Sequence, residues 1–425
     1  MIKKKEFYTQ FGIICGILLV FAALLRSSDV YHVLNEIHIE TYNYPESTDF
    51  HVATTDSVIS SISKERIGKR LEGLSRIFHD GRFYNSENGY KSSLYLYEKL
   101  QKVVLADNEL LSVELFNHSS WKQPSVIFRI QGKSDNLVIV GCHVDSINLN
   151  PLKEAPGVDD NLSGVDVLLE TIDVLIDSNV NNFSDWQNTV EFHFYAAEEM
   201  SSLGSRDVFG AYKKQGKRVV AMLQQDMTGF TKKTFENVMP EHFGLVVDYS
   251  SKHLAQFVRR IISEYTDIKS IDTKCNKVCS DQIAPLIFGY PGAYVLESVI
   301  ENSNPYIHTD QDLIDQIDVN HMVQHAKLVT AFVSELSVWI PKYSDENMQS
   351  DQDLFQFSLY DFFILFATSS TRRTIWCIIL VAVAISMSVT LIGDIFSGEN
   401  SETVEPDEVI PLRVSQNDNS NRKIK

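Results

Sequence analysis

The chain has 425 residues, 44% hydrophobic and 22% charged, which is the composition of a globular protein with room for one large domain or two ordinary ones. Its formal net charge of −18 argues against nucleic acid or an anionic membrane surface as a partner, because both select basic surfaces. Function must therefore be sought in particular residues and their spacing.

The N-terminal segment has the layout of a targeting sequence. Residues 1–10 carry a basic cluster, and an uncharged apolar run follows at 11–25. This order is typical of a signal peptide or of an uncleaved signal anchor whose basic end stays in the cytosol. The polar, irregular residues 26–53 are then expected to form a stalk or a pro-segment.

Residues 54–342 alternate short apolar runs with amphipathic segments. Several apolar runs are almost wholly hydrophobic, as in central strands covered on both faces. This alternation predicts a three-layer α/β/α sandwich around a mixed, mostly parallel sheet. The expected helices include 57–78, 89–103, 163–177 and 251–265, and the expected strands are 125–130, 136–142, 189–197, 218–225, 243–249 and 292–298.

A second membrane segment is expected near the C-terminus. Residues 343–373 form an acidic and then aromatic linker, and 374–393 form an apolar run long enough to cross a bilayer as a helix of about 20 residues. The polar tail 394–425 is expected to be disordered. With a cytosolic N-terminus, residues 54–342 would lie in the lumen or outside, so we expect a membrane-associated protein of the secretory pathway.

Cysteine and asparagine positions agree with that route. Cys275 and Cys279 form a close pair, and the sequence has no second pair with which they could make a metal knuckle, so a short-loop disulfide is expected. Sequons at Asn117 and Asn182 are compatible with glycosylation. A third sequon, at Asn161, lies among the candidate site residues described next and is expected to stay unmodified.

Histidines and carboxylates gather after the expected strands. In an open α/β sheet, ligands bind outside the carboxyl ends of the strands, so residues that follow different strands converge there. Singly, such residues are typical of helix caps, solvated surface or structural hydrogen bonds. Together they suit two Zn²⁺ ions, because acidic pairs beside buried strands need a cation to offset their repulsion. The residues are His143, Asp145, Asp159, Asp160, Glu198, Glu199, Asp226 and His308.

Six motifs follow one another along the chain: "GCHVDS", "APGVDDNLSG", "AAEEMSSLGS", "QDMTG", "CNKVCSD" and "NPYIHTDQD". In these motifs and their order the sequence resembles the di-zinc aminopeptidases of the M28 family, in particular the secreted leucyl aminopeptidases of bacteria and fungi. The resemblance covers nearly all of residues 54–342. It implies a zinc exopeptidase fold and two zinc ions per chain.

By this resemblance, Asp159 bridges the two zinc ions. His143 and Asp226 would complete one zinc site, and Glu199 and His308 would complete the other.

The resemblance also implies roles around the metals. Glu198 would be the general base, and Asp145 would orient His143. The peptide bond between Asp159 and Asp160 would be cis.

A substrate pocket is also implied, beside a disulfide between Cys275 and Cys279. The residues that would line this pocket could equally belong to the ordinary hydrophobic core. The sequence departs from the family pattern at Lys277, often an aromatic residue in relatives, and at Gln282, often a histidine. The implied pocket residues are Met227, Tyr294, Leu296, Ile300 and Ile307.

These features predict a metalloaminopeptidase that hydrolyses the N-terminal peptide bond of peptides with a free N-terminus and an apolar first residue. Metal-bound hydroxide would attack, with Glu198 as the base. One alternative is an acyltransferase resembling glutaminyl cyclases, with a single zinc. Another is a non-catalytic receptor ectodomain, which would be expected to have lost ligands; the sequence keeps them all.

Overall fold

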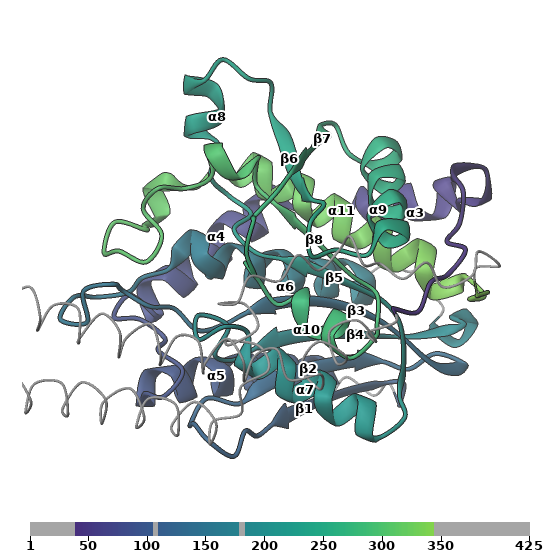
Figure 1. Ribbon diagram of the computed structural model, residues 1–425, viewed down its shortest axis with the longest axis horizontal. Helices are drawn as coiled ribbons and strands as arrows, with labels where there is room; N and C mark the ends of the chain where they lie inside the picture. The colour runs from purple at the N-terminus through teal and green to yellow at the C-terminus, as the bar shows by residue number, and fades with distance from the viewer. Residues whose placement is uncertain (1–38, 105–108, 178–182, 344–425) are drawn as a thin grey trace, which may run out of the picture. The chain divides into compact units, whose positions relative to one another are not determined.

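An eight-stranded mixed sheet carries the fold (Figure 1). In this computed structural model, residues 39–343 are described, apart from 105–108 and 178–182. The strand order is β1-β2-β4-β3-β5-β8-β6-β7. Neighbours are parallel in the pairs β3–β4, β3–β5, β5–β8 and β6–β7 and antiparallel in the rest. The strands are β1 (Leu111–Phe116), β2 (Ser125–Ile130), β3 (Ser134–His143), β4 (Asn188–Tyr195), β5 (Arg218–Gln225), β6 (His242–Val246), β7 (Lys269–Thr273) and β8 (Gly292–Leu296).

Helices cover both faces of this sheet, so the predicted α/β sandwich is confirmed. On one side lie α3 (Val52–Ile59), α4 (Lys64–Ile77), α5 (Glu87–Val104), α6 (Gly164–Asp177), α9 (Lys252–Tyr265) and α11 (Val319–Val338). On the other lie α7 (Leu203–Lys214) and α10 (Ile283–Ile287), and α8 (Lys232–Glu236) is a short helix after β5.

The alternation of side chains along β3 shows why both faces are covered. Val138 and Val140 pack into the large core beneath α6 and α11, whereas Leu137 and Ile139 pack into a second core with Phe209 of α7. Successive strand residues point to opposite faces, so a run that is apolar at every position must be buried on both.

The structure divides the expected helix 57–78 in two. Helix α3 ends at Ile59 and α4 begins at Lys64. Between them, the side-chain oxygen of Ser63 accepts a hydrogen bond from the backbone N–H of Arg66 at 3.2 Å, which caps the new helix.

The domain also begins earlier than Thr54, which lies inside α3. Tyr44 stacks on Trp339 with ring centroids 5.3 Å apart and donates its hydroxyl to the carbonyl of Val220 at 2.7 Å. Tyr42 forms an isolated bridge with Tyr343. Residues 39–53 are therefore packed onto the domain and are not an irregular stalk.

Within the described ranges, no helix is long and apolar enough to span a membrane. The expected membrane segments at 11–25 and 374–393, with residues 1–10, 26–38 and 344–425, lie outside those ranges, as does Asn182.

Candidate metal centre

The central strands bring the candidate residues to one edge of the sheet. His143 is the last residue of β3, Glu198 and Glu199 come shortly after β4, and Asp226 directly follows β5. Because β3 lies between β4 and β5 and is parallel to both, these residues leave the sheet at the same end.

A first cluster is formed by His143, Glu198 and Asp226, each offering a ligand atom within 4.8 Å of the others. The Nε2 atom of His143 lies 3.2 Å from Oδ1 of Asp226 and 3.0 Å from Oδ1 of Asp160. His143 is fully buried.

A second cluster is formed by Asp160, Glu199 and His308, again within 4.8 Å. The Nε2 atom of His308 lies 2.8 Å from Oε2 of Glu199 and 3.1 Å from Oδ2 of Asp160. One oxygen of Asp160 therefore faces each imidazole, and its carboxylate joins the two clusters.

The residue between the clusters is Asp160, where the sequence had predicted Asp159. The Asp159 carboxylate turns away and accepts hydrogen bonds from the Gly229 N–H at 3.0 Å and the Asn304 side-chain amide at 2.9 Å. The cis peptide bond also falls one residue later than predicted, between Asp160 and Asn161. Two adjacent aspartates cannot be distinguished from the sequence alone, because the backbone path of the loop decides which carboxylate faces the imidazoles.

Asp145 holds the two glutamates as well as the histidine. Its carboxylate accepts the backbone N–H groups of Glu198 at 2.9 Å and Glu199 at 3.1 Å. One of its oxygens lies 3.5 Å from Nδ1 of His143, whose Nδ1 is also 3.1 Å from the Asp145 carbonyl. The predicted contact with His143 is thus present, and the contacts to the glutamates add to it.

Sequence reasoning missed several supporting residues, of which Asp312 and Ser280 contact the candidate ligands most directly. The carboxylate of Asp312 accepts the backbone N–H groups of Asp159 and Asp160, each at 3.0 Å. Ser280 donates its hydroxyl to Oδ2 of Asp226 at 2.5 Å. Both lie inside motifs quoted for the resemblance, "NPYIHTDQD" and "CNKVCSD". However, an aspartate or a serine at such a position does not by itself indicate that it binds backbone N–H groups or donates to another carboxylate.

Burial and close charges shift the titration of both clusters. Although burial favours neutral imidazole, hydrogen bonds to Asp160 and Glu199 raise the pKa of His308 to about 11. Burial, with the nearby charge of Asp160, raises the pKa of Glu199 to about 7. Desolvation raises the pKa of Glu198 well above its usual range. Carboxylates packed this closely favour positive charge beside them, which a metal cation between the clusters would supply in place of a proton on His308.

The site fits metal ions by the chemistry of its donors. Imidazole nitrogens and carboxylate oxygens are the ligands that Zn²⁺ takes in catalytic sites. Oε1 of Glu199 is buried and has no hydrogen-bond partner among the residues the structure describes. A buried carboxylate oxygen without a partner is costly, and a cation between the clusters would satisfy it.

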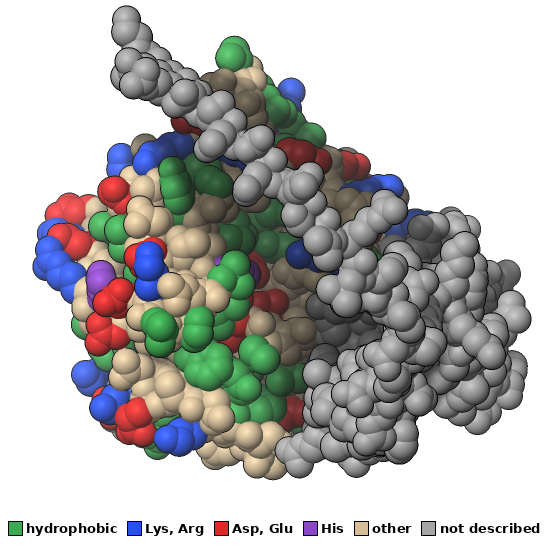
Figure 2. Space-filling model, turned by 60° about the vertical axis from the view of Figure 1, so that its left-hand side comes forward, with side chains coloured by type: hydrophobic (Ala, Val, Ile, Leu, Met, Phe, Trp, Pro, Cys, Tyr) green, Lys and Arg blue, Asp and Glu red, His purple; other side chains and the backbone are tan. Residues whose placement is uncertain are grey.

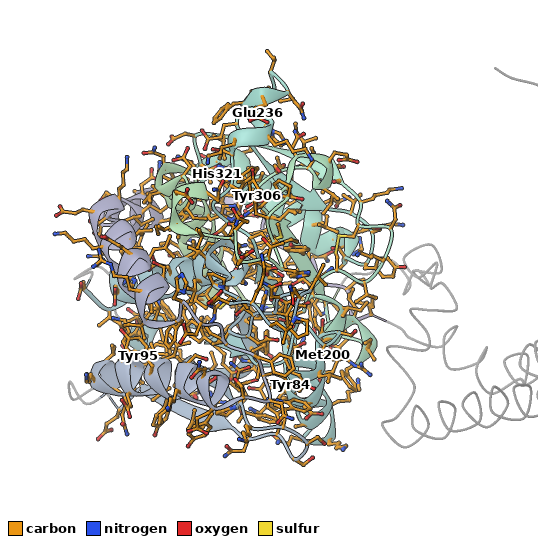
Figure 3. All side chains as sticks on the ribbon, turned by 90° about the vertical axis from the view of Figure 1, so that its left-hand side faces the viewer. Tyr84, Tyr95, Met200, Glu236, Tyr306 and His321 are labelled. Carbon is orange, nitrogen blue, oxygen red and sulfur yellow. A yellow bond between two sulfur atoms is a disulfide. The ribbon has the colours of Figure 1, made fainter. Side chains whose placement is uncertain are left out.

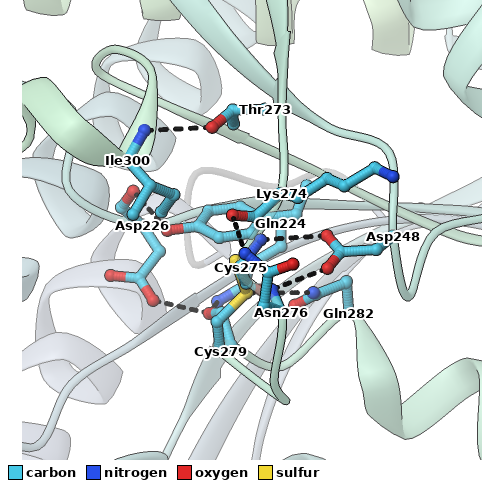
Figure 4. Close-up of a disulfide and its surroundings, with 12 residues drawn as sticks. Gln224, Asp226, Asp248, Thr273, Lys274, Cys275, Asn276, Cys279, Gln282 and Ile300 are labelled. Carbon is cyan, nitrogen blue, oxygen red and sulfur yellow. Dashed lines mark hydrogen bonds between the residues drawn. A yellow bond between two sulfur atoms is a disulfide. The ribbon is translucent and has the colours of Figure 1, made fainter. Parts of the chain in front are cut away.

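The predicted disulfide between Cys275 and Cys279 is present, with an S–S distance of 2.11 Å (Figure 4). Both cysteines pack against an apolar cluster that contains Tyr294 and Leu296, with Ile300 beside them.

This apolar cluster borders the metal centre, because the Tyr294 hydroxyl donates to the Asp226 carbonyl at 3.2 Å. Of the other predicted pocket residues, Met227 directly follows Asp226 and Ile307 directly precedes His308. Neither belongs to the cluster around the disulfide as the structure describes it.

The two departures from the family pattern differ in setting. Lys277 is exposed, whereas Gln282 is fully buried with its Nε2 3.7 Å from the sulfur of Cys279. The buried amide therefore lies against the disulfide (Figure 4), and the lysine is open to solvent.

The metal centre opens to the surface. Met200, directly after Glu199, and Tyr306, two residues before His308, are each 39% exposed and lie on the side that faces the viewer in Figure 3. In Figure 2, carboxylate and imidazole groups lie in a depression bordered by hydrophobic side chains.

The expected sequons differ in access. Asn117 is exposed at the end of β1, so its side chain is accessible. Asn161 is fully buried and donates its amide to the Gln225 carbonyl at 3.0 Å, which leaves no room for a glycan.

Comparison with known proteins identifies the family. A model of peptidase family M28 matches residues 125–333. A probable leucine aminopeptidase of Arthroderma benhamiae is 42% identical over 299 residues, which cover 70% of this chain and 77% of that protein. The chain belongs to peptidase family M28. The family predicted from the motifs, and with it a hydrolase, is confirmed.

Solved structures agree with this fold. LapB from Legionella pneumophila is 25% identical to this M28 peptidase with a TM-score of 0.64, covering 74% of this chain and 81% of LapB. A glutaminyl cyclase from Porphyromonas gingivalis gives a TM-score of 0.50 at 15% identity, covering 64% of this chain and 98% of that one. The second likeness concerns the fold alone.

Proposed function

We propose that this M28 peptidase is a zinc-dependent aminopeptidase that removes apolar N-terminal residues from peptides. The observation that carries the proposal is the Asp160 carboxylate, with one oxygen 3.0 Å from the His143 imidazole and the other 3.1 Å from that of His308. The names of relatives such as the Arthroderma benhamiae protein support the reaction type.

Two zinc ions fit the two clusters. His143 and Asp226 would hold one, Glu199 and His308 the other, and Asp160 would bridge them. Bound zinc would polarise the scissile carbonyl and lower the pKa of a water molecule.

Glu198 is the residue we assign to proton transfer. Its backbone is fixed by Asp145, and it is the half-buried member of the first cluster, beside the buried His143 and Asp226. Desolvation raises its pKa, which strengthens it as a base. The Glu198 carboxylate would take a proton from the attacking water and return it to the leaving amine.

The substrate's first side chain would enter the apolar cluster beside the disulfide, formed by Tyr294 and Leu296 with Ile300. Met227 and Ile307 would complete this pocket from the two sides of the metal centre. An apolar side chain gains free energy on leaving water, about 25 cal/mol per Å² buried. The surrounding carboxylates would attract the charged N-terminal amine.

The test uses the full chain, expressed through an oxidising secretory route. Leucine coupled to a chromogenic amine is the substrate, assayed untreated, after chelation and after zinc is added back. We expect release that chelation abolishes and zinc restores. No release by a protein that holds two zinc ions would overturn the proposal.

An acyltransferase of the glutaminyl cyclase kind is the second candidate. The likeness to the Porphyromonas gingivalis enzyme concerns the fold alone. The second cluster has three candidate ligands, Asp160, Glu199 and His308, which argues against a site for a single zinc ion. Counting zinc ions per chain and testing cyclisation of an N-terminal glutamine separates the two.

We further propose that the protein follows the secretory route and is held in a membrane by 11–25 and 374–393. The Cys275–Cys279 disulfide and the exposed Asn117 support an oxidising compartment. We expect glycosidase treatment to lower the apparent mass of the wild-type protein, and to have no such effect on the double variant Asn117→Gln, Asn182→Gln. Recovery of the protein in the cytosolic fraction, without membranes, would contradict this proposal.

A further inference from the structure

Arg82 is a fully buried arginine beside the metal centre. Its guanidinium donates three hydrogen bonds to backbone carbonyls: Nε to Val144 at 2.6 Å, Nη1 to Pro156 at 2.6 Å and Nη2 to Gly157 at 2.9 Å. Hydrogen bonds from a charged donor are among the stronger ones in proteins, so the guanidinium holds these three carbonyl groups tightly.

The three carbonyls belong to the two ends of one loop. Val144 lies between His143 and Asp145, and Gly157 is three residues before Asp160. A single side chain therefore ties the end of β3 to the segment that carries the residue between the two clusters.

Ser146 provides a second connection between Arg82 and this loop. The Arg82 backbone N–H donates to the Ser146 hydroxyl at 3.0 Å, and that hydroxyl donates to the Ala155 carbonyl at 2.7 Å. Backbone and side chain of Arg82 thus both fasten residues 144–157.

The loop is closely fitted around the guanidinium. Gly157 has φ of +51°, and a Cβ atom built there would lie 2.9 Å from Nη2 of Arg82 and 2.4 Å from the Asp160 carbonyl oxygen. A side chain at this position would push the arginine and the bridging segment apart, so glycine is required.

The charge of Arg82 suits its surroundings. Burial lowers its pKa to about 10, against the attraction of nearby carboxylates that include Asp312, Asp145 and Asp160. It therefore remains a cation at neutral pH and offsets part of the acidic charge of the site.

We propose that Arg82 is a positioning residue of the metal centre: its planar fork holds both ends of loop 144–157, and so sets the separation of His143 from Asp160. This inference rests on the proposed function, in that zinc is taken as the metal. Lysine cannot replace it, because one ammonium group cannot reach three carbonyls spread around a guanidinium plane.

The experiment measures zinc affinity in the full chain, by competition with a chromogenic chelator, for the wild type, Arg82→Lys and Arg82→Met. This readout needs no turnover. We expect both variants to bind zinc about 10- to 100-fold more weakly, as when partners of metal ligands are lost elsewhere. Wild-type affinity in Arg82→Lys or in Arg82→Met would overturn the proposal.

Arg70 provides a matched control for the loss of a buried cation. It is 10% exposed and pairs with Asp166, Glu170 and Asp173 in the contact between α4 and α6. Arg70→Met should lower thermal stability and keep zinc affinity within about twofold of the wild type, because among the described residues none of its partners belongs to either candidate metal cluster. An equal loss of affinity in Arg70→Met would mean that general destabilisation explains the effect, which also overturns the proposal.

Ser146→Ala decides the matter if the Arg82 variants do not fold. It removes one tie without leaving a buried charge, and a several-fold weaker zinc affinity is expected; unchanged affinity counts against the proposal. A wild-type chain that binds no zinc would overturn the proposed function together with this inference, whereas normal zinc binding and turnover in Arg82→Met would overturn this inference alone.

Discussion

Glu198 and Glu199 are neighbours in the chain, yet their carboxyl groups lie in different clusters, Glu198 with His143 and Glu199 with His308. The two oxygens of Asp145 each accept one of their backbone N–H groups, at 2.9 and 3.1 Å. The backbone therefore directs the carboxyl groups of Glu198 and Glu199 into different clusters, so the two adjacent residues can have different roles.

The first prediction follows from that division. Glu198→Gln should keep both zinc ions and lower kcat about 10²- to 10⁴-fold, because the amide cannot accept a proton. Glu199→Gln, the matched variant, should lose zinc from the second cluster. Zinc content and kcat measured on the same preparations check both, and near-normal turnover in Glu198→Gln would show that another group is the base.

A second prediction separates the adjacent aspartates. Asp160→Asn should lose zinc and activity, since its two oxygens face His143 and His308. Asp159→Asn should keep zinc but unfold more easily, by about 1–3 kcal/mol, because its buried hydrogen bonds to Gly229 and Asn304 are weakened. Metal analysis and thermal unfolding of the pair test this; the reverse pattern would restore Asp159 as the bridging residue.

Removal of the metal should be visible in stability. A metal that binds the native state and not the unfolded chain stabilises the fold by about 2.7 kcal/mol at a hundredfold excess over its Kd. Chelation should therefore lower Tm, and zinc should restore it, while Asp160→Asn should show no such response. An identical Tm with and without chelator in the wild type would argue against a tightly bound ion.

The disulfide should affect substrate binding more than chemistry. Cys275 and Cys279 pack beside Tyr294 and Leu296 and belong to neither candidate metal cluster. Cys275→Ser with Cys279→Ser should raise KM for leucyl substrates and leave kcat within about threefold, as expected when only binding common to ground and transition states is lost. A fall in kcat at constant KM would place the disulfide in the catalytic step instead.

Stability at mildly acidic pH should depend on His193. This buried histidine lies 2.8 Å from a Glu191 oxygen through Nε2 and 2.9 Å from the Tyr195 hydroxyl through Nδ1, and burial lowers its pKa. The unfolded chain takes up a proton below about pH 6.5, so the native state loses stability as the pH falls.

Denaturation of the wild type and of His193→Gln over a pH series measures this effect. The stability difference between them should shrink as the pH falls below about 6.5. A difference that grows would mean that His193 is protonated in the folded protein.

The central strands were predictable because burial on both faces makes them apolar at every position. The edge strands β1 and β7 were missed, since most of their residues are exposed or only partly buried and they therefore lack a continuous apolar run. Helix α11 was not among the expected helices; His321, His325 and Thr330 are buried within it, and such polar residues obscure an apolar face.

The candidate site was predicted in its residue types and its place at the sheet edge, because strands fix where their ends lie. The choice between Asp159 and Asp160 depends on backbone turns in a loop that Asp312 holds from more than a hundred residues away in sequence (152 and 153 residues). Arg82 was missed for a similar reason: its partners are carbonyls, and these leave no trace in side-chain chemistry.

The pairing of Tyr42 with Tyr343 has a practical consequence. The guanidinium of Arg218, at the start of β5, lies 4.7 Å from the centre of the Tyr343 ring, whereas Asp226 follows the last residue of that strand. Eight extended residues span about 25 Å, so Tyr42 and Tyr343, near the two ends of the described domain, lie at the end of the sheet remote from the metal centre. A solid support attached close to either tyrosine would therefore be held at the end of the sheet opposite the metal centre.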